Sequence, residues 1–355
     1  MNDYDLWFTI LKITNKDKLN LIKQFGDTKE IWYRFINEQK FKEKFCYDES
    51  KINKIKETMI RDEISAVFYT DDNYPKALKN YEDMPIGLFY KGNIKKLNSI
   101  SNNVAIVGSR KCTHYGIDTT RIICRELVKH DIGIISGMAR GIDSYAHAEC
   151  IENGGYTCAI LGSGANVIYP RENKSLYCNI IKDGCIISQY EPDTKPFAYN
   201  FPVRNAIISG LSKLVVVIEA GIKSGSLITA TDALEQGKDV GAVPGSIFSQ
   251  MSLGTNMLIK EGAHPITKGS DIFSILGLQI NEEKELNSKT RCKVCGTIEK
   301  NLYSLITDIP IHIDDIKRLT NIDIKELYEL LFEMQLKNEI LCLSGNYYVR
   351  INDTF

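Results

Sequence analysis

The chain has 355 residues, enough for two or three domains, and it is 43% hydrophobic and 25% charged. This composition excludes disordered, collagen-like and disulfide-scaffold proteins. The longest apolar run, Leu214 to Ile218, is far shorter than the roughly 20 residues of a membrane span, and the acidic start has no signal-peptide pattern. We therefore expect a cytoplasmic protein whose ten cysteines are reduced.

The formal net charge of −1 argues against a strongly basic nucleic-acid protein. By segment, the net charge is +1 for residues 1–65, +2 for residues 66–300 and −4 for residues 301–355. A site for a polyanion must therefore be local, and the C-terminal segment is the least suitable place for it.

The first predicted elements are helices. Residues 1–64 are rich in Lys, Glu, Ile and Leu and show no strand alternation, and Leu19, Ile22 and Phe25 followed by Gly26 indicate an amphipathic helix and its end. We expect a small all-helical domain over residues 1–64. Two strands follow, over residues 65–70 and 86–90.

Six short apolar runs recur through the middle of the chain. They begin at Val104, Ile132, Cys158, Cys185, Leu214 and Val240. Runs without alternation are typical of strands buried on both faces, and each interval leaves room for one crossover helix. We expect these helices over residues 117–130, 142–152, 172–182, 204–211, 227–236 and 255–261. The fold class is then α/β, a Rossmann-like, doubly wound, mostly parallel sheet over residues 65–280.

The C-terminal part begins with a polar stretch, residues 281–300, which we interpret as a linker. Beyond it, the pattern predicts helices over residues 302–306, 313–319 and 324–336 and a hairpin from Ile340 to Ile351. Three helices and a hairpin indicate a winged-helix domain over residues 301–355.

The turns that follow the six runs are where a parallel sheet binds its ligands. All six contain Ser and five contain Gly, and Arg110, Arg140 and Lys223 add cations. Glycine lets a backbone approach a ligand closely, and successive N–H groups form an anion cradle. In any single turn, the Gly can be explained by the backbone turn and the Ser by capping of the next helix. The six turns together, with their three cations, favour phosphate binding.

Sequence motifs for other chemistries are weaker or absent. Gly162 to Val167 begins like a dinucleotide fingerprint but lacks the third glycine, and neither a P-loop nor a nucleophile elbow occurs. Cys292 and Cys295 supply two of four zinc ligands, which leaves metal binding or reduced thiols open. We expect no catalytic residue and no cofactor, and we assign no metal ligand to the site.

The segment between the fourth and fifth runs, Tyr190 to Asn205, brings aromatic residues and cations together. Phe197, Tyr199 and Phe201 alternate with Lys195 and Arg204. Aromatic rings stack on bases while cations follow the backbone, as a single strand of nucleic acid requires. The alternative is a hydrophobic plug under a loop.

These motifs resemble the DNA-processing protein A (DprA/Smf) family. The resemblance runs from about Tyr74 to Ala263, through Gly108-Ser-Arg110, Ser136 to Asp143, Gly162-Ser-Gly164 with Ile168-Tyr-Pro170, Phe201 to Asn205, Ser224 to Ala230 and Val243-Pro-Gly245. It implies a non-enzymatic protein of natural transformation and recombination that binds and protects single-stranded DNA, forms a homodimer through the Rossmann-like domain and loads the RecA recombinase. It also implies a SAM-like N-terminal domain.

Carried over by position, the resemblance implies a site for single-stranded DNA. Its residues would be Gly108, Ser109, Arg110, Gly137, Arg140, Gly141, Lys195, Phe197, Arg204, Asn205, Lys223, Ser224, Gly225 and Ser226. Two positions depart from the family pattern: Ala206 replaces a second arginine, and Gln189 stands where an acid is common. The first departure removes a cation from the expected site for single-stranded DNA.

Two further expectations concern the partner of the C-terminal domain and an alternative function for the chain. The third C-terminal helix carries Glu326, Glu329 and Glu333, so we expect its domain to contact protein rather than duplex DNA. The rival function is a Rossmann-like nucleotide-binding or nucleotide-processing enzyme, whose P-G-G-x-G-T turn and catalytic Glu are poorly matched by Glu219 to Ser226. A scaffold with a vestigial pocket is a third reading.

Overall fold

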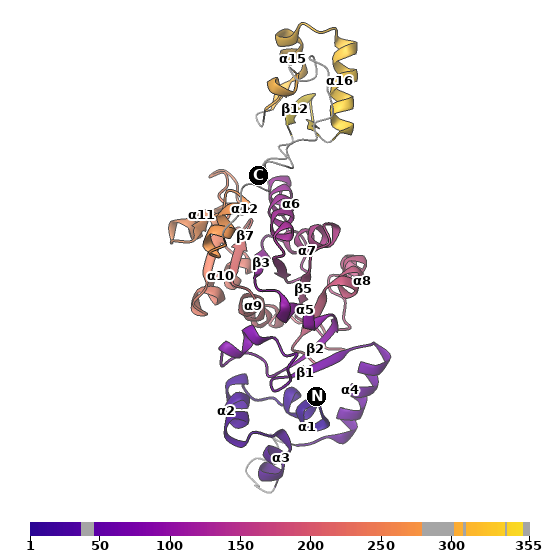
Figure 1. Ribbon diagram of the computed structural model, residues 1–355, viewed down its shortest axis with the longest axis vertical. Coiled ribbons are helices and arrows are strands. Elements are labelled where there is room, and N and C mark those ends of the chain that lie inside the picture. Colours follow the sequence, from indigo (N-terminus) through magenta and orange to yellow (C-terminus); the bar gives the residue numbers. More distant parts are fainter. Residues whose placement is uncertain (37–45, 279–301, 308–309, 338, 351–355) are drawn as a thin grey trace. The chain divides into compact units, whose positions relative to one another are not determined.

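The computed structural model describes residues 1–36, 46–278, 302–307, 310–337 and 339–350. The chain divides into two compact units, Met1–Leu278 and Gln279–Phe355. Figure 1 labels most of their helices and several of their strands. The predicted linker over residues 281–300, with Cys292 and Cys295, lies outside the described residues.

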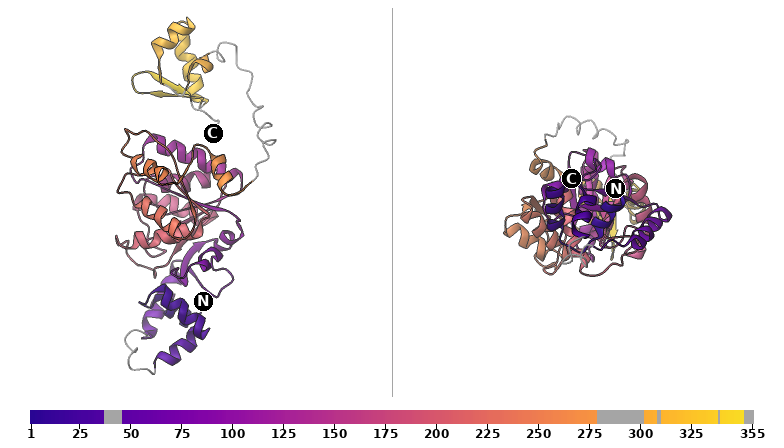
Figure 2. Two further views of the ribbon diagram at one scale, coloured as in Figure 1. Left: turned by 90° about the vertical axis from the view of Figure 1, so that its left-hand side faces the viewer. Right: turned by 90° about the horizontal axis from the view of Figure 1, so that it is seen from below.

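The first unit begins with four helices, as the composition predicted: α1 (Asp3–Ile10), α2 (Asn15–Phe25), α3 (Thr28–Ile36) and α4 (Glu49–Arg61). Thr14 caps α2, and Gly26 ends it with a φ of 75°. Figure 2 shows these helices gathered at one end of the unit, beside the first strands. Trp7 and Phe8 share one apolar cluster with Phe68 and Phe89 of those strands. The domain boundary at residue 64 therefore stays a prediction.

A nine-stranded sheet forms the centre of the first unit, in the order β1-β2-β6-β5-β4-β3-β7-β8-β9. Its strands are β1 (Ser65–Phe68), β2 (Gly87–Gly92), β3 (Asn103–Val107), β4 (Gly133–Ser136), β5 (Thr157–Ile160), β6 (Cys185–Ser188), β7 (Leu214–Val217), β8 (Asp239–Ala242) and β9 (His264–Pro265). The strands from β6 to β9 in this order are parallel, and β1 and β2 add an antiparallel edge. The mostly parallel, Rossmann-like sheet predicted from the six apolar runs is confirmed.

Helices cover both faces of this sheet, which explains why the runs are apolar without alternation. On one side α6 (His114–Lys129), α7 (Ile142–Glu152) and α8 (Lys174–Asp183) lie in succession, and on the other α9 (Asn200–Leu211) packs on α10 (Gly225–Glu235). Along β5, Cys158 and Ile160 join one apolar cluster while Ala159 joins another. Each strand therefore buries both of its faces.

The shorter elements complete the first unit. They are the 3₁₀ turns η1 (Lys76–Asn80) and η2 (Arg171–Asn173), and the helices α5 (Ile94–Ser99), α11 (Leu253–Lys260) and α12 (Gly269–Ile275). The eight cysteines among the described residues are all free. No helix in the described ranges is long and apolar enough to cross a membrane.

The second unit has the predicted winged-helix elements. Residues 302–305 are helical, followed by β10 (Ile311–His312), α15 (Ile313–Thr320), α16 (Ile324–Leu336), β11 (Ile340–Leu343) and β12 (Tyr347–Arg350). The three strands form a sheet in the order β10-β12-β11 around its own apolar core. Strand β10, only two residues long, was not predicted.

Candidate nucleic-acid interface

The sheet reverses its winding direction between β3 and β7. From β3 the chain proceeds through β4 and β5 to β6 on one side, and from β7 through β8 to β9 on the other. The loops after β3 and β7 therefore diverge, and a crevice opens between them at the carboxyl edge. A pocket of about 730 Å³, which we call the switch-point pocket, lies there.

Nine of the fourteen predicted site residues line this pocket. They are Gly108, Ser109, Arg110, Arg204, Asn205, Lys223, Ser224, Gly225 and Ser226. The loops after β3 and β7 supply five of them, the start of α10 (Gly225–Glu235) supplies Gly225 and Ser226, and α9 supplies Arg204 and Asn205. Residues more than a hundred positions apart in the chain thus share one cavity.

The first loop, after β3, is held by a dense set of backbone contacts. The Ser109 N–H donates to the Glu219 carbonyl at 2.7 Å, and the Ile142 N–H donates to the Ser109 carbonyl at 3.2 Å. Gly141 has a φ of 74°, and a Cβ there would lie 2.2 Å from the Ser109 carbonyl oxygen. Only glycine allows this approach, so Gly141 supports the loop from behind rather than lining the pocket.

The Arg110 side chain is exposed at the pocket. Its guanidinium lies 5.5 Å from the ring centroid of Phe201, and it makes no ion pair within the described part of the chain. Lys111 and Lys223 also line the pocket, and the single acidic residue among the lining residues is the buried Asp143. The cavity therefore has an excess of positive charge.

Arg204 has a different environment from Arg110, because its side chain is buried. Its Nη1 donates to the carbonyl of Gly137 at 2.7 Å and to that of Ile160. A Cβ on Gly137 would meet the guanidinium at about 2.5 Å, so glycine makes room for it. Burial lowers the pKa of Arg204 to about 10, while the charge of Asp143 opposes this shift. Arg204 therefore stays charged at neutral pH, and it joins the ends of β4 and β5.

The second loop, after β7, ends in the capped start of α10. Ser224 is the N-cap, and its hydroxyl lies 2.7 Å from that of Ser226. A Cβ added to Gly225 would meet no atom within 4 Å, so the first turn of the helix is open to the cavity. The Ser226 N–H donates to the Ser224 hydroxyl, but the positive end of the helix, with a cation nearby, still favours an anion.

Five predicted residues are not among those that line the pocket. Gly137 and Gly141 support it as described. Arg140 is exposed and forms an ion pair with Glu172. Lys195 and Phe197 are exposed on the loop before α9, where the rings of Phe197 and Tyr199 stack with centroids 5.4 Å apart.

Several lining residues were absent from the predicted site. Phe201 and Tyr169 belong to motifs singled out in the sequence, and Lys111 directly follows Arg110, so each had a local signal. Met251 had none: its sulfur lies 3.3 Å from the Ser109 hydroxyl, although the two residues are 142 positions apart.

Among the described residues, no group of three His, Cys, Asp or Glu side chains could hold a metal ion. His147 is buried, with Nδ1 2.6 Å from the Thr157 hydroxyl, and burial lowers its pKa to about 3. The carboxylate of Glu219 is also occupied, because it accepts hydrogen bonds from Thr113. Neither residue is arranged as a general base at the pocket.

Comparisons with known proteins agree on one family. The model of "DNA recombination-mediator protein A" matches residues 65–277. The chain is 44% identical to DNA processing protein DprA of Streptococcus pneumoniae, over 58% of this chain and 71% of that protein. It is 36% identical to protein Smf of Escherichia coli, over 77% of this chain and 74% of that protein.

Solved structures give the same result. The X-ray structure of DprA from Streptococcus pneumoniae superposes with a TM-score of 0.68 at 34% identity, covering 79% of this chain and 99% of that one. DprA from Helicobacter pylori, described for its single-stranded DNA binding mode, gives a TM-score of 0.55 at 31% identity and covers 60% of this chain and 95% of that one.

Proposed function

Because the chain belongs to the DNA recombination-mediator protein A family, we propose that it binds single-stranded DNA in the switch-point pocket without altering it chemically. The observation that carries this proposal is the pairing of the exposed Arg110 with the open start of α10 across one cavity. A phosphate between them would meet a cation on one side and the positive end of a helix on the other.

The loop before α9 extends the proposed site beyond the cavity. Pro196 and Ala198 line the pocket, while the neighbouring Phe197 and Tyr199 stack on each other and are exposed. Exposed rings next to a phosphate cradle provide surfaces for bases, and Lys195 adds a cation to the same loop. The strand would leave the pocket across these rings.

The rival function, nucleotide processing, is less well supported. It needs a carboxylate free to act on a bound nucleotide, and Glu219 is instead bound by the backbone and hydroxyl of Thr113. The proposal therefore assigns no catalytic residue, and it treats binding as the activity of the pocket.

The wider role that we propose is recombination mediation: protection of the strand during natural transformation, loading of RecA and dimerisation through the Rossmann-like part. For the C-terminal unit we propose a protein contact rather than a duplex contact. Tyr328, Phe332 and Leu336 are exposed along α16 beside its glutamates, and this combination repels phosphates but suits a protein surface.

The test is a fluorescence titration of the full chain with a single-stranded oligonucleotide of about 20 nucleotides, a duplex and a mononucleotide over a range of salt. Single strands should bind best, and log affinity should fall with log salt at a slope of about −0.7 for each phosphate neutralised. Arg110→Ala should weaken binding by about 1.5–3 kcal/mol, the range for a charge-assisted hydrogen bond.

The matched control is Arg171→Ala, which removes the same charge from an exposed position that does not line the pocket. The control variant should bind the single strand as tightly as the wild type, once the non-specific effect of removing one positive charge is subtracted. If Arg110→Ala binds as tightly as Arg171→Ala, the switch-point pocket is not the DNA site.

A further inference from the structure

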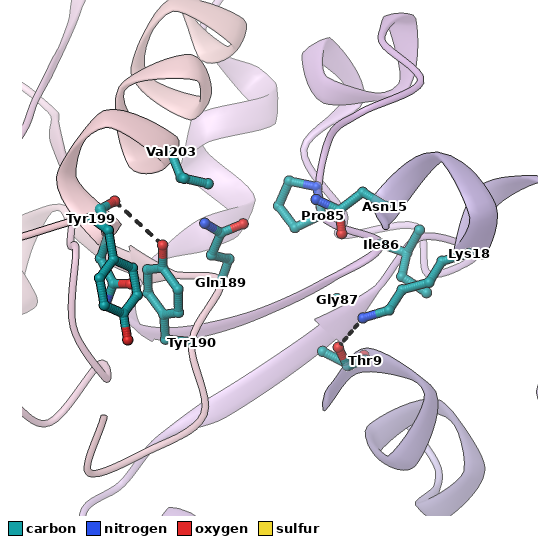
Figure 3. Close-up of a pocket in the computed structure, with 11 residues that line it drawn as sticks. Thr9, Asn15, Lys18, Pro85, Ile86, Gly87, Gln189, Tyr190, Tyr199 and Val203 are labelled. Carbon is teal, nitrogen blue, oxygen red and sulfur yellow. Dashed lines mark hydrogen bonds between the residues drawn. The ribbon is translucent and has the colours of Figure 1, made fainter. Parts of the chain in front are cut away.

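A second cavity lies where the N-terminal helices meet the edge of the sheet. Its volume is about 320 Å³, at the small end of the range for ligand sites. We call it the N-terminal pocket. Figure 3 shows Thr9, Asn15 and Lys18 on one wall and Gln189, Tyr190 and Val203 on the opposite wall. The cavity is lined by segments that are more than 170 positions apart in the chain.

The wall formed by the helices contains a buried cation without a counter-ion. The Lys18 side chain belongs to a residue only 5% exposed, and its Nζ donates one hydrogen bond, 2.5 Å long, to the Thr9 carbonyl. No ion pair to Lys18 occurs among the described residues, and burial lowers its pKa to about 8, with no charged neighbour contributing. Two of its three N–H donors are left for another acceptor.

A second polar group beside Lys18 is also unsatisfied. The hydroxyl oxygen of Thr9 is buried without a hydrogen-bond partner. It is held close to β2, because a Cβ on Gly87 would lie 2.0 Å from it. Buried charges and hydroxyls without partners are costly. Two such groups on one wall of one cavity therefore indicate a missing anionic ligand.

The donors favour a phosphate over a carboxylate. Lys18, the Thr9 hydroxyl and the amide of Gln189 come from different directions, which suits a tetrahedral group, and Asn15, whose amide donates to the Asp83 carbonyl, lies beside them. We propose that the N-terminal pocket binds a phosphate monoester, with its oxygens on Lys18 and Thr9 and its organic part against the rings of Tyr190 and Tyr199.

The phosphate monoester has two possible sources. It is either a free nucleotide or the phosphorylated end of a bound strand. Ala198 and Phe201, on either side of Tyr199 and Asn200 in the chain, line the switch-point pocket, whereas Tyr199 and Asn200 line this one, so we expect a strand end to reach both. The strand-end source rests on the proposed function, whereas phosphate binding itself does not.

The experiment measures the thermal unfolding of the full chain with inorganic phosphate against chloride at equal ionic strength and pH 7.0, which lies below the pKa of about 8 of Lys18. It is done in the Arg110→Ala background, so that phosphate in the switch-point pocket contributes little. Phosphate should raise the melting temperature, and Lys18→Met should weaken phosphate binding at least about tenfold. The matched control is Lys16→Met, since Lys16 lies on the same helix but is exposed and paired with Glu82.

A second variant keeps the test decisive if Lys18→Met fails to fold. Val203→Glu places a carboxylate on the opposite wall at an exposed position, so it should abolish the phosphate effect without loss of stability. The proposal is overturned if phosphate has no effect, if the effect survives both Lys18→Met and Val203→Glu, or if acetate acts as strongly as phosphate.

Two ligands then distinguish the sources, in the chain with Arg110 intact. If the ligand is a strand end, a 5′- or 3′-phosphorylated oligonucleotide should bind more tightly than the hydroxyl form, and Lys18→Met should remove only that difference. If it is a nucleotide, a mononucleotide should compete with phosphate but not with the oligonucleotide. Failure of the proposed function would appear as lost oligonucleotide binding with the phosphate effect intact.

Discussion

Thr113 donates both its backbone N–H and its hydroxyl to the carboxylate of Glu219, at 2.8 and 2.6 Å. This pair joins the start of α6 to the end of β7, which are 106 positions apart. The carboxylate lies at the N-terminus of α6, where the helix dipole favours a negative charge. It also holds the loop that carries Arg110 in place. Glu219 therefore acts as a structural link under the pocket.

Glu219→Ala should destabilise the protein by about 1–3 kcal/mol, because it leaves the Thr113 N–H without an acceptor. Urea denaturation measures the change. A catalytic role for Glu219 would give the opposite pattern: a variant as stable as wild type that has lost nucleotide hydrolysis.

The stability of the fold should depend on His147 at mildly acid pH. Thr157 donates its hydroxyl hydrogen to the Ile134 carbonyl, so His147 must be the donor to Thr157, and its Nε2 is buried without a partner. Burial lowers its pKa to about 3, from 6.5. The unfolded chain binds the extra proton first, so stability is full above pH 6.5 and falls as the pH falls toward 3.

Between pH 7 and pH 5 this histidine should cost about 2 kcal/mol of stability. Chemical denaturation of wild type and His147→Gln at both pH values measures it, since the glutamine variant lacks this part of the loss. Equal losses in the two proteins would mean that His147 titrates normally in the fold.

Gly225 offers a way to separate binding from folding. A side chain there enters the open cavity and contacts nothing within 4 Å of its Cβ, so Gly225→Leu should change stability by less than about 1 kcal/mol. The same change fills the space beside the start of α10, and oligonucleotide affinity should fall at least about tenfold. Gly225→Ala, which adds only a methyl group, is the control and should bind more tightly than the leucine variant. Unchanged affinity of the leucine variant would exclude the start of α10 from the interface.

Replacement of Arg204 should destabilise the protein much more than replacement of Arg140. Arg204→Met removes the donor to the Gly137 and Ile160 carbonyls and leaves Asp143 buried without its cation, which should cost about 3–5 kcal/mol. Arg140→Met breaks only an exposed pair with Glu172 and should cost under about 1 kcal/mol. Denaturation curves of the two variants, measured together, would refute this difference if their midpoints coincided.

The regular part of the fold could be predicted because the relevant signals are local. The apolar runs that begin at Val104 and Leu214 start within one residue of the first residues of β3 and β7, respectively. Gly26 ends α2 as expected. Strands β9 and β10 have two residues each, too short to form a run. Their pairing depends on neighbouring strands rather than on their own sequence.

The candidate site could be predicted in its chemistry but not in its details. The turns after β3 and β7 had to meet, because the ends of parallel strands share one edge. The burial of Arg204 and the pairing of Arg140 depend on Gly137 and Glu172, which nothing in the pattern linked to them. The N-terminal pocket was missed for the same reason, since Lys18 and Tyr190 become neighbours only through the packing of helices on an edge strand.

The pairing of β3 with β7, with Val104 opposite Leu214, has a consequence for biosynthesis. Five of the residues that line the switch-point pocket precede residue 112, three lie between residues 139 and 169, and fifteen follow residue 195. A nascent chain therefore cannot present the completed crevice until β7 has left the ribosome and inserted beside β3. Premature termination before that point would yield a fragment unable to compete with intact copies for the same ligand.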